Sequence, residues 1–389
     1  MPAGSDLTQD ALLVGVLLIA LVLLGLLRRA RSRRPAGPAG PAAQGSEPVL
    51  RPWVAVVANP TKVDDVDERQ AWLARASARH GLAPPIWLET TIEDPGLGQA
   101  GTAVEIGAQA VLAYGGDGTV RSIASRLAGT GVPLGLLPTG TGNLLARNLG
   151  IPVGDLDAAL DVALAGTDRK LDVGRVTVDV SGEDVPARRE AFLVMTGLGF
   201  DAEVMASVEP KLKKRVGWMA YVVAGARLLR GRQTKVTIRM DGEPVVHRRI
   251  RSVIVGNCGE LTAGVRLLPD ARPDDGWLDV VVVAPRNVVG WAGVVAAVLS
   301  GSRHGHPLVE RFRCQQVDIR AERPLPVQID GDPAGIARAM SAGLDCLGLV
   351  VRVPEGGDSA PYGAPGPGQE PANGVAAPSA APLRRPQTT

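Results

Sequence analysis

The sequence of 389 residues has little net charge, few cysteines and no Walker A motif, and each shortage excludes a class of protein. A formal net charge of +2 provides no overall positive field, so nucleic acid is not an expected partner. The three cysteines lack CxxC spacing, which predicts reduced thiols and a cytosolic compartment for the folded part. No glycine-rich stretch is followed by the Gly-Lys-Ser/Thr of a P-loop.

Two glycine-rich turns, each after a short apolar run, dominate the middle of the first half of the chain. The runs Ala110–Tyr114 and Val132–Leu137 are short and bounded by turn residues, so we expect buried strands. Helical spacing follows each turn, over Val120–Leu127 and Leu144–Leu149. A glycine turn at a helix N-terminus presents backbone N–H groups to an anion, and two such turns predict one polyphosphate held from two sides. The predicted phosphate-binding residues are Gly115, Gly116, Asp117, Gly118, Thr119, Thr139, Gly140, Thr141, Gly142 and Asn143.

Asp117 is the exception in this set, because its carboxylate would repel a phosphate group. A cation between the two would remove the repulsion, so Asp117 predicts a Mg²⁺ bridge. The alternative interpretation is two ordinary strand–helix turns, with Asp117 as the N-cap of its own helix. The combination of both turns with Thr and Asn donors favours phosphate binding.

These turns also carry a family resemblance. GGDGT, followed some twenty residues later by PTGTGN, resembles the diacylglycerol kinase catalytic domain, a fold also found in sphingosine kinases and bacterial lipid kinases. The resemblance implies an α/β nucleotide-binding domain, then a β-rich antiparallel sandwich, with catalysis between them. It also implies that Asn59 and one of Thr90 or Thr91 contact ATP. The alternative to ATP contact is that the two threonines are β-branched residues that end a strand and have no role in binding.

The resemblance extends into the second half of the chain. Thr196–Ala202 is similar to the family's Gly-x-Gly-Phe-Asp-Ala segment, and Leu267–Asp279 to its Pro-Asp-Ala-x-x-x-Asp-Gly-x-Leu pattern. In relatives the loop that matches Leu267–Asp279 binds a structural Mg²⁺. The resemblance therefore implies Asp275 as a ligand, together with the main-chain carbonyls of Arg272 and Trp277. Carboxylate and carbonyl oxygens suit a hard cation. An Asp-rich turn without metal is the alternative.

A third match lies at Asp330-Gly331-Asp332, which resembles the family's Asp-Gly-Glu. The glutamate of that motif is the proposed general base for the lipid hydroxyl, so the resemblance implies this role for Asp332. A plain hairpin turn is the competing interpretation. The chain departs from the family at Ser122, where Glu is common, and at Leu144, where Asp is common. These departures leave a weakly active or non-catalytic membrane-tethered nucleotide or lipid sensor open as an alternative function. A soluble-metabolite kinase such as NAD kinase is a further alternative, which the predicted N-terminal membrane anchor and the Asp332 match disfavour.

An apolar run near the N-terminus predicts a membrane anchor. Ala11–Leu27 has seventeen residues without charge, about 25 Å as a helix, which is at the short end for crossing a bilayer. No Lys or Arg precedes it, which argues against a signal peptide. The basic cluster Arg28–Arg34 follows it, so the rest of the chain is expected on the cytoplasmic side of the cell membrane, after a single pass.

The residue pattern after the predicted anchor divides the rest of the chain into further segments. Alternating strands and helices give way after residue 170 to short, turn-punctuated β segments, among them the expected strands His247–Val255, Gln316–Arg320 and Leu325–Ile329. The predicted divisions are the anchor 11–27, a Pro-rich linker 28–52, an α/β domain 53–170, a β-rich domain 171–354 and a disordered tail 355–389. Together these features predict a membrane-anchored, ATP- and Mg²⁺-dependent lipid kinase. Its predicted partners are a lipid substrate in the membrane and, as an option, a second copy of the chain. Diacylglycerol, a sphingoid base, a glycolipid and a polyprenol stay open as acceptors.

Overall fold

The protein is described by a computed structural model at residues 52–180, 187–199, 233–261, 266–299 and 308–356. The predicted anchor, almost all of the linker and tail, and residues 200–202 of the Gly-Phe-Asp-Ala segment lie outside these ranges, so the expectations for them stay predictions. Within the described ranges, no helix combines the length and apolarity needed to cross a bilayer.

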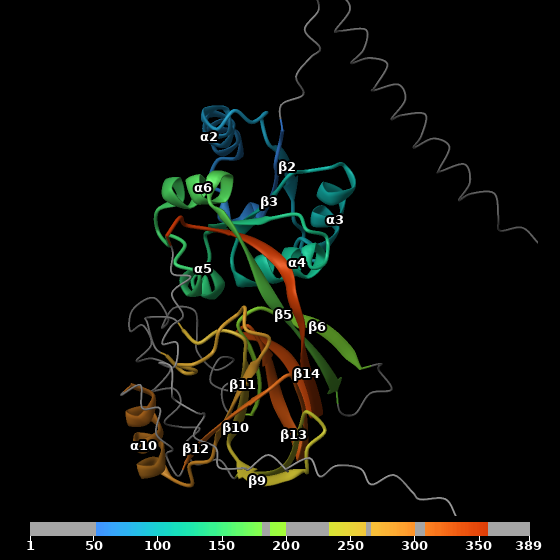
Figure 1. Ribbon diagram of the computed structural model, residues 1–389, viewed down its shortest axis with the longest axis vertical. Coiled ribbons are helices and arrows are strands. Elements are labelled where there is room, and N and C mark those ends of the chain that lie inside the picture. Colours follow the sequence, from blue (N-terminus) through green and yellow to red (C-terminus); the bar gives the residue numbers. More distant parts are fainter. Residues whose placement is uncertain (1–51, 181–186, 200–232, 262–265, 300–307, 357–389) are drawn as a thin grey trace, which may run out of the picture. The chain divides into compact units, whose positions relative to one another are not determined.

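The first part is an α/β unit built on four parallel strands (Figure 1). The strands lie in the order β4-β3-β1-β2. Every residue of β1, β3 and β4 is buried, as expected for a parallel sheet that is covered on both faces. The elements are β1 (Ala55–Ala58), a 3-10 turn (Pro60–Lys62), α2 (Val66–Arg79), β2 (Ile86–Glu89), α3 (Leu97–Glu105), β3 (Val111–Gly115), α4 (Asp117–Leu127), β4 (Leu134–Pro138), α5 (Leu144–Asn148) and α6 (Leu156–Ala165).

Local sequence signals explain where several of these helices begin. The side chain of Asp65 accepts a hydrogen bond from the N–H of Glu68 at 3.0 Å and so caps α2. Asp155 caps α6 in the same way, through the N–H of Ala158 at 3.0 Å. Helix α4 begins at Asp117 instead of the expected Val120, so most of the first glycine-rich turn is already helical.

The second part is β-rich and antiparallel, which confirms the predicted fold class for the described residues. It has its own buried core of apolar side chains. Its elements are β5 (Thr167–Val180), β6 (Arg188–Phe192), β7 (Met195–Gly199), β8 (Thr234–Met240), β9 (Val246–Ile250), β10 (Ser252–Gly256), β11 (Leu278–Val283), α10 (Val288–Leu299), β12 (Val309–Cys314), β13 (Gln316–Ile329) and β14 (Asp332–Val353).

Two strand predictions in this part were wrong in detail. His247–Val255 is not one strand, because the chain turns at Arg251 and forms β9 and β10. Conversely, Gln316–Arg320 and Leu325–Ile329 belong to the single strand β13. The register of β13 against β14 shifts between Arg320 and Leu325. Such an irregularity bends a strand without ending it, which explains why the sequence suggests two short strands there.

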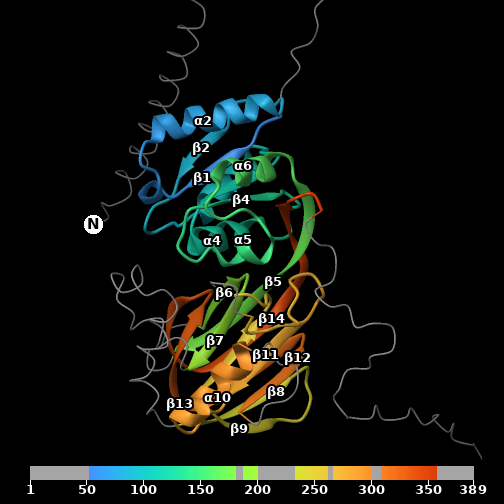
Figure 2. The same ribbon diagram turned by 90° about the vertical axis from the view of Figure 1, so that its left-hand side faces the viewer.

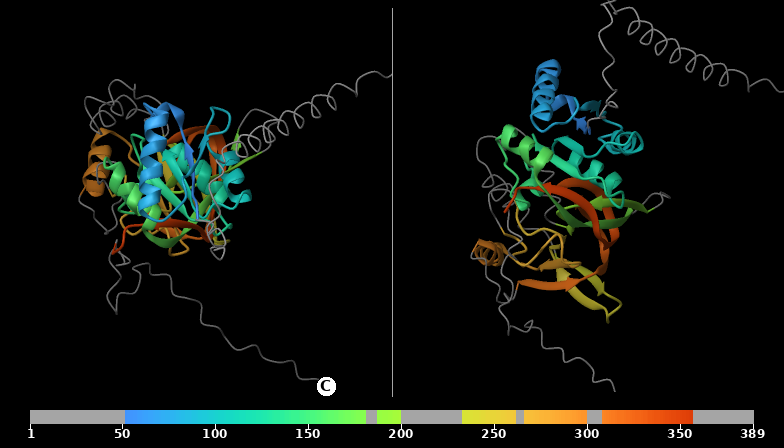
Figure 3. Two further views of the ribbon diagram at one scale, coloured as in Figure 1. Left: turned by 90° about the horizontal axis from the view of Figure 1, so that it is seen from above. Right: turned by 45° about the horizontal axis from the view of Figure 1, so that its top comes forward.

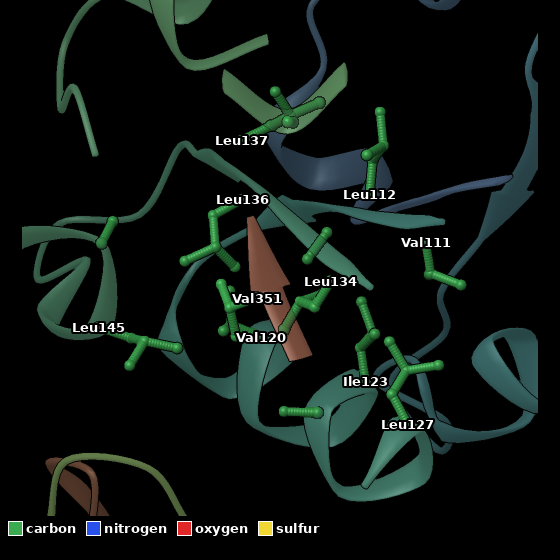
Figure 4. Close-up of a cluster of buried hydrophobic side chains, with 14 of the residues drawn as sticks. Val111, Leu112, Val120, Ile123, Leu127, Leu134, Leu136, Leu137, Leu145 and Val351 are labelled. Carbon is green, nitrogen blue, oxygen red and sulfur yellow. The ribbon is translucent and has the colours of Figure 1, made fainter. Parts of the chain in front are cut away.

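The long strand β14 joins the two parts. It pairs with β13 and β5 along the β-rich part, and near its end Val351 pairs with Leu134 of β4 (Figures 1 and 3). Val351 is fully buried and lies near Leu134 and Val120 in the core of the α/β part (Figure 4). The chain therefore returns to the first part at the end of β14, a feature that the predicted division at residue 170 does not contain. Helices α4 and α5 lie at the border between the two parts (Figure 2).

Candidate active site

The two glycine-rich turns lie directly against each other at the carboxyl edge of the parallel sheet. The N–H of Thr139 donates to the carbonyl oxygen of Gly115 at 3.1 Å. A Cβ at Gly140 would lie only 2.7 Å from the Cα of Gly116. Glycine is thus required at position 140 because the two backbones are in contact there. The absence of a side chain would also let a phosphate group approach the backbone.

Asp117 links these two turns through backbone hydrogen bonds. Its carboxylate accepts the N–H of Asn143 at 2.8 Å and the N–H of Leu144 at 2.6 Å. Leu144 is the first residue of α5, so Asp117 stabilises the N-terminus of α5 and not that of its own helix, whose N-cap is Gly116. The interpretation of Asp117 as the N-cap of its own helix is therefore wrong. Peptide N–H groups compensate part of its charge, so a cation is no longer the only reason for a carboxylate here.

The protonation of Asp117 reflects two opposing effects. Burial raises its pKa above the usual value, while the N–H groups of Leu144 and Asn143 lower it. The carboxylate of Asp332 raises it further by repulsion. A partly buried acid with a perturbed pKa and an acidic neighbour is typical of a functional site.

The second turn is fixed by Asn143 and leaves one polar group unpaired. Asn143 has a left-handed backbone with φ of 49°. Its side-chain oxygen accepts the N–H of Gly140 at 2.9 Å, and its side-chain nitrogen donates to the carbonyl of the same residue at 2.9 Å. The hydroxyl of Thr139 is buried and has no hydrogen-bond partner among the described residues. Such a group is the kind that a bound ligand satisfies.

Asn59 and Thr90 lie at the same edge of the sheet. The N–H of Asn59 donates to Tyr114 at the end of β3, and that of Thr90 to Ala58 at the end of β1, both at 2.9 Å. Strand β1 lies between β3 and β2, so the strand order reverses beside β1. Open α/β sheets bind ligands at the carboxyl ends of their strands at such a point. Thr91 differs, because it is exposed and its hydroxyl accepts the N–H of Asp94 at 3.0 Å.

Asp332 reaches this edge from the β-rich part. A Cβ at Gly118, in the first turn of α4, would lie 3.4 Å from its Oδ2. The guanidinium of Arg121, one turn further along α4, lies 3.0 Å from the same oxygen. Arg121 was not among the predicted site residues. The available signal was its spacing of four from Asp117, which puts both side chains on one face of the helix.

The hairpin that carries Asp332 is held by a buried carboxylate. Asp330 accepts the N–H groups of Leu193 and Val194, both at 2.9 Å, and of Met195 at 3.0 Å. Burial raises the pKa of Asp330, and Arg121 and these N–H groups lower it. Asp330 and Gly331 have φ of 48° and 87°, as a tight hairpin turn requires. The hairpin interpretation is thus correct for the backbone, and the hairpin also delivers Asp332 to the glycine-rich turns.

The predicted structural metal residues lie elsewhere, in the loop before β11. The carboxylate of Asp275 is paired with Arg313 and also accepts the N–H of Trp277 at 3.1 Å. Arg272 lies 3.5 Å from Asp274, which is bound in turn by Arg169. The part of the chain that the structure covers holds no group of three or more His, Cys, Asp or Glu side chains suited to a metal ion. The Mg²⁺ site at Arg272, Asp275 and Trp277 stays a prediction.

Comparison with known proteins agrees with this fold. Residues 54–176 match the family model of the diacylglycerol kinase catalytic domain, and residues 194–348 that of the YegS C-terminal NAD kinase beta sandwich-like domain. A Pseudomonas aeruginosa protein named "Probable lipid kinase YegS-like" is 32% identical over 294 residues, 72% of this chain and 87% of that protein. The diacylglycerol kinase of Bacillus subtilis is 28% identical over 229 residues, 58% of this chain and 72% of that enzyme. The crystal structure of a diacylglycerol kinase from Bacillus anthracis has the same fold, with a TM-score of 0.59 and 20% identity over 79% of this chain and 98% of that one.

These matches define the class of protein as a kinase enzyme that acts on lipids. More particularly, the chain belongs to the diacylglycerol kinase catalytic-domain family. The resemblance inferred from the glycine-rich turns is confirmed at this level.

Proposed function

We propose that the chain transfers the γ-phosphoryl group of ATP to the hydroxyl of a membrane lipid at the border between its two parts. The observation that carries the proposal is the convergence of Asp117 and Asp332. Asp117 joins both glycine-rich turns, and Asp332 approaches the first turn of α4 from the β-rich part. Phosphoryl transfer to an alcohol needs a site that binds the phosphates and a nearby carboxylate that can accept the hydroxyl proton.

In this proposal the phosphates of ATP lie along the glycine-rich turns, near the unpaired hydroxyl of Thr139. The lipid hydroxyl oxygen attacks the γ-phosphorus, and the bond from that phosphorus to the β-phosphate oxygen breaks, releasing ADP. Asp332 accepts the hydroxyl proton as the new P–O bond forms. Its side chain is 54% exposed, so an acceptor can reach it.

The residues present also fit a Mg²⁺ ion that arrives with the nucleotide. Protein-bound Mg²⁺ usually takes one or two carboxylates together with substrate phosphates. Asp117 supplies such a carboxylate, whose oxygens retain lone pairs beyond the two backbone hydrogen bonds that they accept. The ion would neutralise charge that develops on the transferred group. Chelation with EDTA should therefore stop the reaction, and added Mg²⁺ should restore it.

We also propose that Ala11–Leu27 anchors the chain in the cell membrane, with the catalytic part on the cytoplasmic side. An anchor raises the effective concentration of a lipid acceptor near the site without any new contact. The clustered arginines after this segment suit anionic headgroups on that side.

The test is an assay with γ-labelled ATP, Mg²⁺ and total membrane lipid as the acceptor mixture. The proposal expects label in the lipid fraction, in a band whose mobility identifies the acceptor. Label that stays in ATP and inorganic phosphate under all conditions would refute phosphoryl transfer to lipid.

A further inference from the structure

Arg121 connects the two parts of the protein beside the candidate site. It lies in α4, and its side chain is only 17% exposed. One end of its guanidinium donates to the carbonyl oxygen of Ile329 at 2.7 Å, and the other lies 3.0 Å from Oδ2 of Asp332. Both acceptors belong to the β13–β14 hairpin, so one planar group holds the backbone of the hairpin and its carboxylate together.

The Asp332 side chain needs such a partner. The hairpin backbone is fixed by the hydrogen bonds that Asp330 accepts, and none of these three bonds involves the Asp332 side chain. Repulsion from Asp117 would also turn it away from the glycine-rich turns. The positive charge of Arg121 opposes this repulsion and keeps Oδ2 against Gly118.

We propose that Arg121 is a positioning residue, which acts on phosphoryl transfer through Asp332 and does not itself hold the nucleotide. This inference rests on the proposed function. A general base must lie within hydrogen-bond reach of the proton that it takes, and an error of about 1 Å can lower a rate by about 100-fold. The value of the Arg121–Asp332 pair is therefore geometric, since a half-exposed ion pair adds little to stability.

The chain offers a matched control at Arg175. This arginine of β5 is 23% exposed, and its Nε lies 2.6 Å from Asp345 of β14. It also donates to the hydroxyl of Ser125 on α4 at 3.2 Å. Arg175 thus ties α4 to β14 as Arg121 does, but through a different part of each element.

The experiment compares Arg121→Gln, Arg121→Lys, Asp332→Ala, the double variant Arg121→Gln/Asp332→Ala, and Arg175→Gln in the full chain. Turnover and the KM for ATP are measured with labelled ATP and total membrane lipid, and the melting temperature is recorded for each variant. We expect Arg121→Gln to lower turnover by about 10- to 100-fold with less than about a 3-fold change in the KM for ATP. Arg121→Lys should recover part of the loss, because an ammonium can meet only one of the two acceptors well.

The double variant distinguishes an effect of Arg121 through Asp332 from a direct effect of Arg121 on the nucleotide. If Arg121 acts only through Asp332, removing it from the Asp332→Ala protein causes no further loss of turnover. Arg175→Gln should change the melting temperature but keep turnover within about 2-fold.

Three outcomes would overturn the inference while the proposed function survives. These are additive losses in the double variant, a large rise in the KM for ATP in Arg121→Gln, and full turnover of a folded Arg121→Gln protein. A wild-type chain that labels no lipid refutes the proposed function, and the inference falls with it.

Discussion

The carboxylate of Asp117 accepts the peptide N–H of Leu144 at 2.6 Å, across the border between the two glycine-rich turns. Leu144 occupies the place at which relatives commonly carry an aspartate, yet its role in this contact uses only the backbone. The substitution therefore leaves the link between the two turns intact. The same contact gives Asp117 a structural function beside any catalytic one.

The close approach of the two turns predicts a steric cost at Gly140. In Gly140→Ala the new methyl group would lie 2.7 Å from Gly116 and 2.8 Å from the Asn143 side-chain oxygen. We expect about 1–3 kcal/mol of lost stability and a clear loss of turnover, because the turns must separate. Thermal unfolding and the lipid-labelling assay measure the two effects. Gly343→Ala is the control, since its Cβ would meet its nearest atom at 3.7 Å. Equal behaviour of the two variants would contradict the proposed packing of the turns.

The role of Asp332 as the base predicts a selective kinetic effect. Asp332→Ala should lower turnover by about 10²- to 10⁴-fold and leave the KM for ATP nearly unchanged, because the proton leaves the acceptor and not the nucleotide. Asp332→Glu should retain or raise turnover, since relatives carry the longer acid at this place. Steady-state kinetics on both variants, with melting temperatures as the folding control, provide the comparison. Full turnover of the alanine variant would remove Asp332 from the mechanism.

The three cysteines predict a pattern of chemical modification. Burial raises the pKa of Cys314 to about 12 and that of Cys258 even further, so neither forms a thiolate near neutral pH in the folded protein. Cys346 is exposed. Its pKa is also raised, but to a smaller extent, and its sulfur is accessible. Iodoacetamide at pH 8 should modify Cys346 alone until the protein is unfolded, as peptide mass spectrometry can show. Early modification of either buried thiol would contradict the two cores described above.

We expect the predicted anchor to be separable from the folded part of the chain. Removal of residues 1–34 should leave a folded protein, because the buried core of the α/β part begins at Val54, with Trp53 packed against it. Activity on short-chain lipid in detergent should persist, and activity on intact membranes should fall. Gel filtration and the two assays test this. Aggregation of the truncated chain, or equal loss in both assays, would show that the N-terminal segment is part of the fold.

The local features of the fold could be predicted from the sequence. The strands before both glycine-rich turns follow from short apolar runs, and the α/β and β-rich parts follow from the change in periodicity. Errors occurred where a local irregularity changes strand limits, as at Arg251 and between Arg320 and Leu325. Such bends depend on the neighbouring strands and leave no regular pattern in the chain itself.

The contacts that build the site could not be predicted in the same way. Asp117 binds backbone N–H groups, which every residue except proline possesses, so Asn143 and Leu144 carry no sign of the contact. Arg121 and Asp332 meet only because β14 and the hairpin before it fold back against α4. The pairing of Val351 with β4 is also long-range, and the sequence around this valine is as suitable for a strand that pairs only within the β-rich part.

The most direct test of the account is the transfer of label from γ-labelled ATP to membrane lipid by the wild type and by Asp117→Asn. The amide keeps one acceptor oxygen but directs an N–H₂ group at a peptide N–H, and it loses the negative charge that strengthens these hydrogen bonds and that attracts a cation. We predict labelled lipid with the wild type, a loss of about 10³-fold or more in the variant, and about 1.5–3 kcal/mol of lost stability. Near-normal labelling by a folded Asp117→Asn protein would contradict the central role of Asp117.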